Sequence, residues 1–328
     1  MDKRTRTGGV AVLLVVWLVA TAGAGAGVTY GLLSDDGTAS GTIHIAAGSS
    51  GPPDGQSFDD ANGNGRYDAG ETTYSAAQLA DFDNESVNLV VPDSVDSIDQ
   101  QNSDVRIRAG AITYGGSASA QNGDVSLTAV DGDVTLDGGT LDSQNGAVHV
   151  DAPNGELSLT DGTVSSQNSD VRLSAGDAVT IAGADIDAQN GNVQITTDAA
   201  LDADGSDIEA KNSHVALTGR TVSARNADLS SRNDYVRLSA TRNGGGPLDV
   251  TGASLASQNS DVTLESNGDV HANGSTMEST NGAVTADLGT ATATLFLDGA
   301  TVDDRDDAVS YRPTGVRVVP TGGPATPA

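Results

Sequence analysis

The feature of this 328-residue sequence that most constrains its fold is an internal repeat of about 22 residues. Its marker is an asparagine, usually preceded by glutamine, which recurs at Asn102, Asn122, Asn145, Asn168, Asn190, Asn212, Asn233, Asn259 and Asn281. The successive spacings are 20, 23, 23, 22, 22, 21, 26 and 22 residues. A fixed period of this length is typical of solenoids, in which each unit buries its apolar side chains by stacking on its neighbours.

The one long spacing and the end of the series both have an explanation in the sequence. The 26-residue interval contains an insertion at residues 243–247, NGGGP, which is rich in turn-forming residues. After Asn281 the motif degenerates, and a tenth copy is predicted at residues 305–306. We therefore expect one continuous repeat body over residues 100–311.

Each unit contains three short segments in which apolar and polar residues alternate, separated by Gly, Asn or Asp, and this alternation predicts three strands per unit. The first segment places two apolar residues on one side in eight units, at Val105 and Ile107, Val125 and Leu127, Val148 and Val150, Val171 and Leu173, Val193 and Ile195, Val215 and Leu217, Val236 and Leu238, and Val262 and Leu264. The third segment is predicted to point inward Leu141, Val164, Ile186, Ile208, Val222, Leu255 and Met277. Small residues follow at a tight corner, at Ser143, Ser166, Ala188, Ala210, Ala224, Ser257 and Ser279.

This pattern predicts an all-β fold, a right-handed parallel β-helix of about nine to ten coils. Successive coils would stack at about 4.8 Å, with the asparagines aligned at one corner. We expect their amides to hydrogen-bond along the axis and their backbone to adopt the left-handed conformation. Each coil buries about five small apolar side chains, worth about 1.5–3 kcal/mol apiece, against the ordering entropy of the whole unit. Stacking must supply the remaining stability, which suits a chain with only 3 Phe and 1 Trp.

The flanks of the repeat are expected to protect its ends, because bare strand edges pair with other chains. Residues 72–99 are predicted to form an N-terminal cap, and residues 291–298 are predicted to cover the other end. Residues 312–328, rich in Pro, Gly and Thr, are predicted to be a flexible tail.

Residues 1–33 have the order of an export signal. Lys3, Arg4 and Arg6 precede an apolar stretch, so this segment is predicted to be a cleaved signal peptide or an uncleaved membrane anchor. Residues 25–48, GAGVTYGLLSDDGTASGTIHIAAG, resemble the exported biofilm-fibre and camelysin class that a SipW-type signal peptidase processes. The resemblance is confined to this part of the chain and implies export, cleavage near Tyr30 or Gly31, and residence at the cell surface or in the matrix.

Residues 34–71 contain a match to the twelve-residue calcium loop D-x-[DN]-x-[DN]-G-x5-E. Side chains at positions one, three, five, nine and twelve and a main-chain carbonyl at position seven would supply the oxygens that Ca²⁺ prefers, from Asp60, Asn62, Asn64, Asp68, Glu71 and Arg66. The segment DANGNGRYDAGE resembles EF-hand-like, dockerin-type and surface-adhesin calcium loops, which implies a structural Ca²⁺.

The surroundings of this loop favour a lone loop over a complete EF-hand. Pro52, Pro53 and Gly55 disfavour an entering helix, whereas residues 74–83 are suited to a short exiting one. We expect the loop to rigidify the junction before the repeats. The alternative is an Asx-rich turn that binds no ion.

The charge balance limits the classes of partner that the chain is expected to bind. With 45 acidic against 16 basic residues, the net charge is −29, which disfavours nucleic acid because phosphate neutralisation needs clustered Lys and Arg. Only Lys3 and Lys211 are lysines, and this acid-rich, lysine-poor composition resembles proteins of extreme halophiles. The alternative setting is an acidic cell wall or a calcium-rich medium. The absence of cysteine excludes disulfides and thiolate sites.

The sequence offers no concentrated set of catalytic residues. His44, His149, His214 and His271 lie far apart in the chain, which disfavours zinc binding. Enzymes of this architecture that cut acidic polysaccharides need clustered carboxylates and aromatic platforms, and residues 100–300 contain only three aromatic rings. We therefore expect no catalytic residue and no cofactor other than Ca²⁺.

These observations predict a noncatalytic structural or adhesin-like protein of the cell surface or extracellular matrix. Its partners would be surface or matrix components, with membrane anchoring through the N-terminal apolar segment and self-association as further expectations. The alternative is a bactofilin-like scaffold that forms filaments, and the third hypothesis is a polysaccharide-active enzyme. Asn84 and Asn273 begin two N-glycosylation motifs.

Overall fold

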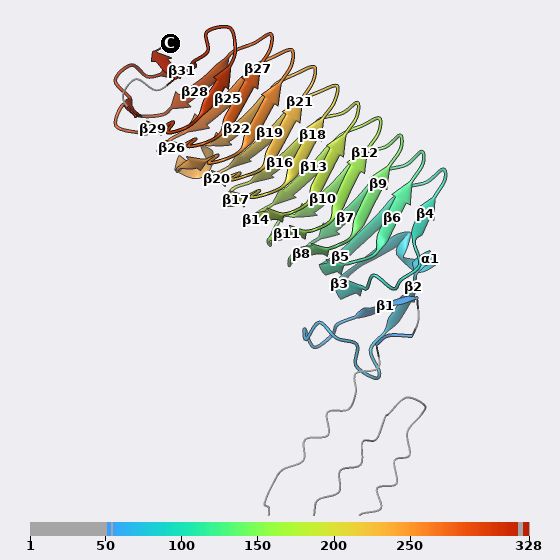
Figure 1. Cartoon of the computed structure of the whole chain (residues 1–328). Coiled ribbons are helices and arrows are strands. Elements are labelled where there is room, and N and C mark those ends of the chain that lie inside the picture. Colours follow the sequence, from blue (N-terminus) through green and yellow to red (C-terminus); the bar gives the residue numbers. More distant parts are fainter. Residues whose placement is uncertain (1–50, 54, 321–323, 328) are drawn as a thin grey trace, which may run out of the picture. The chain divides into compact units, whose positions relative to one another are not determined.

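The computed structural model describes residues 51–53, 55–320 and 324–327. The predicted fold class is confirmed: these residues form an all-β parallel solenoid, whose helices are the four-residue α1 (Ala76–Leu79) and a 3-10 turn, η1 (Arg242–Gly244). Figure 1 shows the coils of this solenoid following one another along a single stack. Each regular coil contributes three strands, and each strand pairs in parallel with its counterparts in the coils before and after it.

The first face of the stack is a ladder of parallel strands, and each coil begins with one of these strands. Its members are β3 (Asp81–Val91), β5 (Val105–Tyr114), β7 (Val125–Ala129), β10 (Val148–Ala152), β13 (Val171–Ala175), β16 (Val193–Thr197), β19 (Val215–Gly219), β22 (Val236–Ala240), β25 (Val262–Ser266), β28 (Val284–Leu288), β31 (Val309–Arg312) and β33 (Ala325–Pro327). Their leading valines pair directly with one another from Val105 to Val284 and are fully buried. The predicted alternation of the first segment is therefore confirmed.

The second face continues from the first, and β3 and β5 are long enough to run through both, which joins the two faces into one sheet of 23 strands. Its own strands are β8 (Val134–Asp137), β11 (Leu157–Thr160), β14 (Val179–Ala182), β17 (Ala200–Asp202), β20 (Thr221–Ser223), β23 (Leu248–Asp249), β26 (Val270–His271), β29 (Thr294–Phe296) and β32 (Arg317–Val319).

The third face is a separate sheet of ten strands. It consists of β4 (Ile98–Gln100), β6 (Ser117–Ala120), β9 (Thr140–Ser143), β12 (Thr163–Ser166), β15 (Asp185–Ala188), β18 (Asp207–Ala210), β21 (Asp228–Ser231), β24 (Ser254–Ser257), β27 (Thr276–Ser279) and β30 (Thr301–Asp303). Inward aliphatic residues stack along it, as predicted, with one exception. Leu229 and Ser231 occupy the places expected for Val222 and Ala224, which lie in and after β20 of the second face.

The asparagines after the third face form a continuous amide ladder, which we call the asparagine ladder. From Asn122 to Asn281 each Nδ2 donates to the Oδ1 of the asparagine one coil earlier, at 2.7–3.0 Å. The serine before this corner is buried in five coils, and its Oγ donates to a main-chain carbonyl one coil earlier at 2.6–2.9 Å, at Ser143, Ser166, Ser231, Ser257 and Ser279. Side chains thus bind coil to coil at this corner.

The prediction of left-handed backbone at these asparagines is wrong. Positive φ recurs instead at the corner between the second and third faces, at Gly138, Asp161, Gly183, Gly205, Asn226, Gly252, Gly274 and Gly299. None of the ladder asparagines has a positive φ. The corner between the second and third faces, and not the asparagine corner, therefore holds the residues that tolerate the left-handed conformation.

The solenoid has about eleven coils, more than the nine to ten predicted. Ten corners, nine with asparagine and one at residues 305–306, join eleven coils, because a coil lies on both sides of every corner. The first coil, β3 and β4, falls inside the segment predicted as a cap, and β29 is a regular strand of the stack. Strands β32 and β33 lie in the segment predicted as a flexible tail.

The N-terminal edge is partly covered by a small hairpin. Strands β1 (Gln56–Asp59) and β2 (Thr73–Ser75) pair antiparallel, and β1 also pairs antiparallel with β3 through Phe58 and Asp59. Helix α1 inserts Leu79, which is fully buried, into the core. Strand β2 and helix α1 lie within residues 72–99, the segment predicted to form a cap, whereas β1 lies in the segment before it, residues 34–71.

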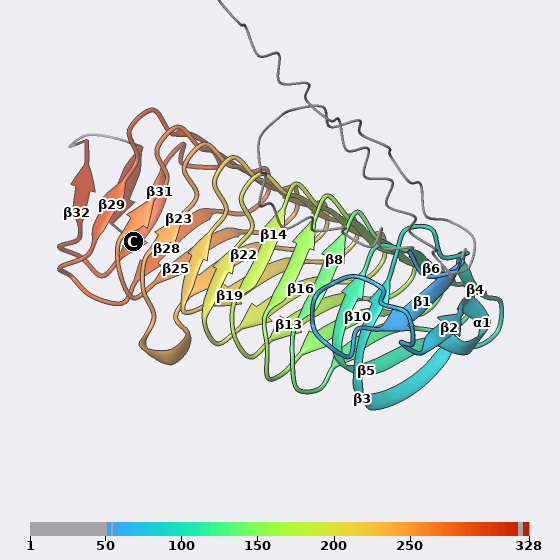
Figure 2. The same ribbon diagram turned by 90° about the horizontal axis from the view of Figure 1, so that it is seen from below.

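The insertion at residues 243–247 leaves the coil regular on either side. Its 3-10 turn, η1, projects from the side of the stack (Figure 2). Arg242 Nη1 lies 3.2 Å from Asp198 Oδ1, and Asn243 Nδ2 donates to the Asp198 carbonyl at 2.9 Å. The insertion therefore folds back along the stack and binds an earlier coil.

The predicted signal peptide or anchor, residues 1–33, and residues 34–50 lie outside the described residues. Within the described ranges, neither α1 nor any other helix has the length and apolar character needed to cross a membrane.

Candidate functional site

The predicted calcium loop, residues 60–71, connects β1 to β2 and is therefore the loop of a β-hairpin. As predicted, no helix enters it, and the short helix that follows, α1, is separated from the loop by β2. Tyr67 packs its ring edge-on against Phe58 at 5.7 Å, which ties the loop to the hairpin. The main-chain N–H of Asp60 donates to the carbonyl of Asn88 in β3 at 2.8 Å, so the loop is also joined to the first coil.

The polar side chains of this loop converge on its interior. Asp60 is 5% exposed and accepts hydrogen bonds from the main-chain N–H groups of Asn64 and Gly65 at 3.0 and 2.7 Å. Both Asn62 and Asn64 donate from Nδ2 to one oxygen of Asp68, at 2.7 and 2.8 Å. These two bonds hold the pKa of the Asp68 carboxyl below its usual value. The loop thus collects anionic oxygens around one turn.

One atom of the loop tests its fit to a cation. Glu71 Oε2 accepts the main-chain N–H of Asp68 at 2.8 Å, whereas Glu71 Oε1 is buried and has no hydrogen-bond partner. A buried carboxylate oxygen without a partner is costly, and a hard cation would compensate it. Across the described ranges no three His, Asp or Glu side chains gather as an ion-holding group, so Ca²⁺ here would also draw on amide and main-chain oxygens.

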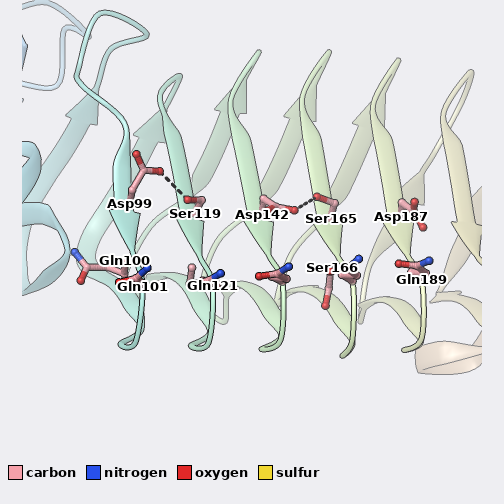
Figure 3. A pocket seen from close by; sticks show the side chains of 13 residues that line it. Asp99, Gln100, Gln101, Ser119, Gln121, Asp142, Ser165, Ser166, Asp187 and Gln189 are labelled. Atoms are coloured by element: carbon pink, nitrogen blue, oxygen red, sulfur yellow. Dashed lines mark hydrogen bonds between the residues drawn. The ribbon is translucent and has the colours of Figure 1, made fainter.

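A second candidate site is a polar groove of about 620 Å³ on the outer surface of the third face. It runs across β4, β6, β9, β12 and β15 (Figure 3). One row alternates carboxylates and hydroxyls, and a second row of glutamines precedes the asparagine ladder. The lining residues are Asp99, Ser119, Asp142, Ser165, Asp187, Gln100, Gln101, Gln121, Gln144, Gln167, Gln189, Ala120 and Ser166.

Register explains the alternation in this groove. Asp99 pairs with Ser119 in the next coil and Asp142 pairs with Ser165, and each serine Oγ donates to its aspartate at 2.7 and 2.6 Å. Hydrogen bonds from Ser97 and Ser119 lower the pKa of Asp99, so this carboxyl is an acceptor and is poorly suited to donate a proton. Both serine hydroxyls donate to carboxylates, so the groove presents a row of hydrogen-bonding groups to the solvent.

Beyond the groove the same face becomes acidic. Asp185, Asp207 and Asp228 pair directly in three successive strands, which forms the row that we call the aspartate ladder. Partial burial raises the pKa of Asp207, and the charges of Asp228 and Asp185 add to that rise. Lys211 bridges the neighbouring row by binding Asp187 at 2.6 Å and Glu209 at 3.4 Å.

The histidines of the described residues pack against other side chains of the stack. His214 stacks on Tyr235 with ring centroids 4.5 Å apart, and His271 stacks on Phe296 at the same distance. Burial lowers the pKa of His214, which favours its neutral form. His149 projects from β10 beside Arg172. The ring stacking of His214 and His271 is therefore contact between successive coils.

Comparison with protein-family models, with curated proteins and with solved structures gave no match to this chain. The function of the chain must therefore be inferred from its own residues. Sequence reasoning singled out the loop at residues 60–71 as a candidate site, and its calcium binding stays a prediction, but sequence reasoning missed the groove. The signal that could have found it is the outward residue two places before each corner glutamine, which is Asp99, Ser119, Asp142, Ser165 and Asp187 in turn.

Proposed function

We propose that this chain is a noncatalytic structural protein of the cell surface or extracellular matrix, acting as a stalk or adhesin-like module. The observation that supports it is the uninterrupted stack of coils, in which the apolar core continues through the solenoid and the asparagine ladder joins the coils from Asn102 to Asn281. A stack of this kind is stiff and elongated, because every coil is fixed by its two neighbours. Its outer faces offer hydrogen-bonding groups and negative charge, which suit contact with hydrated surface polymers.

The proposal includes a structural Ca²⁺ in the loop at residues 60–71. Its support is the motif together with the hydrogen bonds that draw the Asp60 and Asp68 side chains into the loop and the unpartnered oxygen of Glu71. The side chains of Asp60, Asn62, Asn64, Asp68 and Glu71 and the carbonyl of Arg66 would hold the ion. Its charge would offset the mutual repulsion of the carboxylates and fix the hairpin against the first coil.

We also propose that the protein works in strong salt. The aspartate ladder supports this proposal, because like charges at the strand spacing repel each other in dilute solution. Concentrated salt screens that repulsion over a few ångströms. The net charge of −29 would then favour solubility at little cost to the fold.

The proposed location can be tested with single cysteines, because the chain has none of its own. Thr276 is exposed on β27 and its neighbour Met277 is fully buried. With Thr276→Cys, a membrane-impermeant maleimide should label intact cells that produce the protein. Met277→Cys, the matched control, should be labelled only after unfolding. Labelling of Thr276→Cys that required cell lysis would contradict export.

The bactofilin-like alternative makes a different prediction. End-to-end polymerisation needs open strand edges at both ends, and β1 pairs with part of the outer edge of β3. We therefore expect electron microscopy of the purified protein to show separate short rods. Long filaments of one coil diameter would favour the scaffold alternative.

A further inference from the structure

The chain has two Asn-x-Ser motifs, at residues 84–86 and 273–275, and the fold presents them in opposite ways. Such a motif accepts an N-linked glycan when it lies on the surface of an exported chain. A transferase acting on the folded protein must reach both the asparagine amide and the hydroxyl two residues later. The surroundings of each motif therefore decide whether it is used.

The first motif lies on a bulge of β3. Asn84 pairs with Ala109 of β5, and the register then shifts, so that residues 85–87 lie opposite Gly110 alone. Regular alternation from the buried Phe82 would turn Asn84 into the core, where its partner Ala109 is fully buried. The extra residues instead leave Asn84 exposed, because a bulge re-aims the side chains of its strand.

The two functional groups of this motif are accessible together. Ser86 Oγ donates to Asn84 Oδ1 at 2.8 Å, and the Ser86 main-chain N–H donates to the same oxygen at 3.2 Å. Both side chains are exposed, and among the described residues Asn84 Nδ2 has no hydrogen-bond acceptor. Arg108 forms an ion pair with Glu85, which fixes the bulge from the side of β5. The nitrogen that would carry a sugar is therefore free.

The second motif is locked into the stack. Asn273 Oδ1 accepts the main-chain N–H of Asp298 in the next coil at 2.9 Å. Ser275 is 1% exposed, and its Oγ donates to the carbonyl of Ala272 at 2.8 Å. A transferase could reach this hydroxyl only if the coil opened. The fold therefore blocks access to the second motif, although its sequence pattern is the same as that of the first.

We propose that Asn84 carries an N-linked glycan in the exported protein and that Asn273 does not, an inference that rests on the proposed export. The donor is an oligosaccharide carried on a lipid phosphate. Asn84 Nδ2 forms a bond to the anomeric carbon, the bond from that carbon to the phosphate oxygen breaks, and the lipid phosphate leaves. The amide nitrogen loses one proton, and a transferase that recognises the Ser86 hydroxyl directs the reaction.

A glycan at this place has a structural consequence. Strand β1 covers only Leu89 and Val90 of the outer edge of β3, and residues 81–86 of that edge have no strand partner among the described residues. Asp81, Asp83 and a glycan on Asn84 would together block pairing with another chain, as charges on edge strands do. The modification would keep the N-terminal end of the rod monomeric.

The test uses the full chain with a C-terminal tag that contains Asn-Gly-Thr, exported from a host that glycosylates this tag on an unrelated secreted protein. Glycopeptide mass spectrometry should find sugar on Asn84 and on the tag, and none on Asn273. S86A should abolish occupancy of Asn84, and S86T should retain it. S86A removes the hydroxyl and S86T keeps it, and because Asn84 and Ser86 are both exposed, neither variant should disturb folding.

The outcomes separate this proposal from the proposed function. An occupied tag with an empty Asn84, or comparable occupancy at Asn84 and Asn273, would overturn the glycosylation proposal alone. An unmodified tag would show that the chain is not exported and would overturn both. N84Q should also form more dimer than the glycosylated protein at equal concentration in light scattering, and equal masses would contradict the edge-blocking role.

Discussion

At the residue scale, the ladder asparagines bind the coils together from outside the apolar core. An interior member such as Asn168 donates to Asn145 Oδ1 and to the carbonyl of Gln144, and it accepts from Asn190. Each bond joins one coil to another, so the contribution of each residue depends on its position in the series. The first member, Asn102, only accepts, from Asn122.

Asn168→Ala should therefore destabilise the protein by about 1–2 kcal/mol, since it removes bonds in both directions and each net hydrogen bond is worth about 0.5–1.5 kcal/mol. Asn102→Ala, the matched control, should cost less than half as much. Guanidinium unfolding midpoints at a constant m-value measure the difference. Equal losses would mean that the ladder contributes nothing beyond each local turn.

Residues at the position after each ladder asparagine are not interchangeable between coils. Serine follows Asn168 and glycine follows Asn190, so the repeat alone suggests that Gly191→Ser is harmless. A Cβ at Gly191 would lie within 3 Å of the carbonyl oxygen and carbon of Ser169. We expect Gly191→Ser to cost about 1–3 kcal/mol, the range for overpacking, and to lower the melting temperature.

The control for this prediction is Ser169→Gly, which removes a side chain from the same position one coil earlier. It should cost no more than about 1 kcal/mol, the entropic penalty of glycine. A melting temperature of Gly191→Ser equal to that of the wild type would show that the coils are spaced more widely there than described.

The sequence predicted the residues whose environment follows from period-two alternation, and failed where two segments match the same pattern. Val105 and its counterparts were placed correctly because a buried face admits one register. Val222 was misplaced because TVSARN and DLSSRN in one unit both fit the pattern of the third strand. Only the pairing of Ile208 with Leu229 decides between them. Left-handed backbone was misassigned because Asn and Gly occupy both corners.

At the element scale, the third face carries both the groove and the aspartate ladder, and the two have different electrostatics. In the groove Asp99 and Asp142 each accept a serine hydroxyl and Asp187 binds Lys211. In the aspartate ladder, by contrast, Asp207 lies between Asp185 and Asp228. The sequence could not separate these regions, because the partner of a residue is known only once the register between coils is known. The groove could not be predicted for the same reason, because its row of carboxylates and hydroxyls also depends on the register between coils.

Asp207→Asn should stabilise the protein at pH 7 in dilute salt. The raised pKa of Asp207 means that its ionised form is disfavoured in the folded state, so the penalty is present above the folded pKa and vanishes below the unfolded value of about 3.9. We expect a gain of about 0.2–1 kcal/mol, the scale of exposed charge pairs on strands.

Two controls accompany this variant. Asp131→Asn removes the same charge from an exposed turn and should change stability less. The gain from Asp207→Asn should shrink as the pH falls toward 3 and as salt rises to molar concentration. A gain that is independent of both would contradict the repulsion within the aspartate ladder.

The hairpin at residues 56–75 gives a calcium prediction. Calorimetric titration of the exported fragment with Ca²⁺ should give heat, and saturating Ca²⁺ should raise the melting temperature, because an ion that binds only the folded state stabilises it by about 2.7 kcal/mol at 100 times its Kd. Glu71→Gln should abolish both effects, and Glu156→Gln, in an exposed turn, should retain them. Identical titrations of the two variants would contradict a site at Glu71.

At the scale of the whole molecule, residues 81–320 form one continuous stack with a thin core of small side chains. Nearly all of the described buried hydrophobic residues form a single cluster from Leu79 to Val316, and Phe58, Ala147 and Ala308 lie outside it. Nearly all of its stability therefore comes from contacts between neighbouring coils, which the sequence revealed through its period. The ends were less predictable, because β3 and β32 lack the repeat motif and take their structure from the coil on which they stack.

The measurement that tests this continuity most directly is the distance between paired spin labels along the outward row of the third face. The chain has no cysteine of its own, so Ser119→Cys can be combined with Ser230→Cys or with Asp303→Cys. At about 4.8 Å per coil, a continuous stack should give about 24 Å for the first pair, five coils apart, and about 38 Å for the second, eight coils apart. A second distance equal to or shorter than the first would contradict a single continuous solenoid.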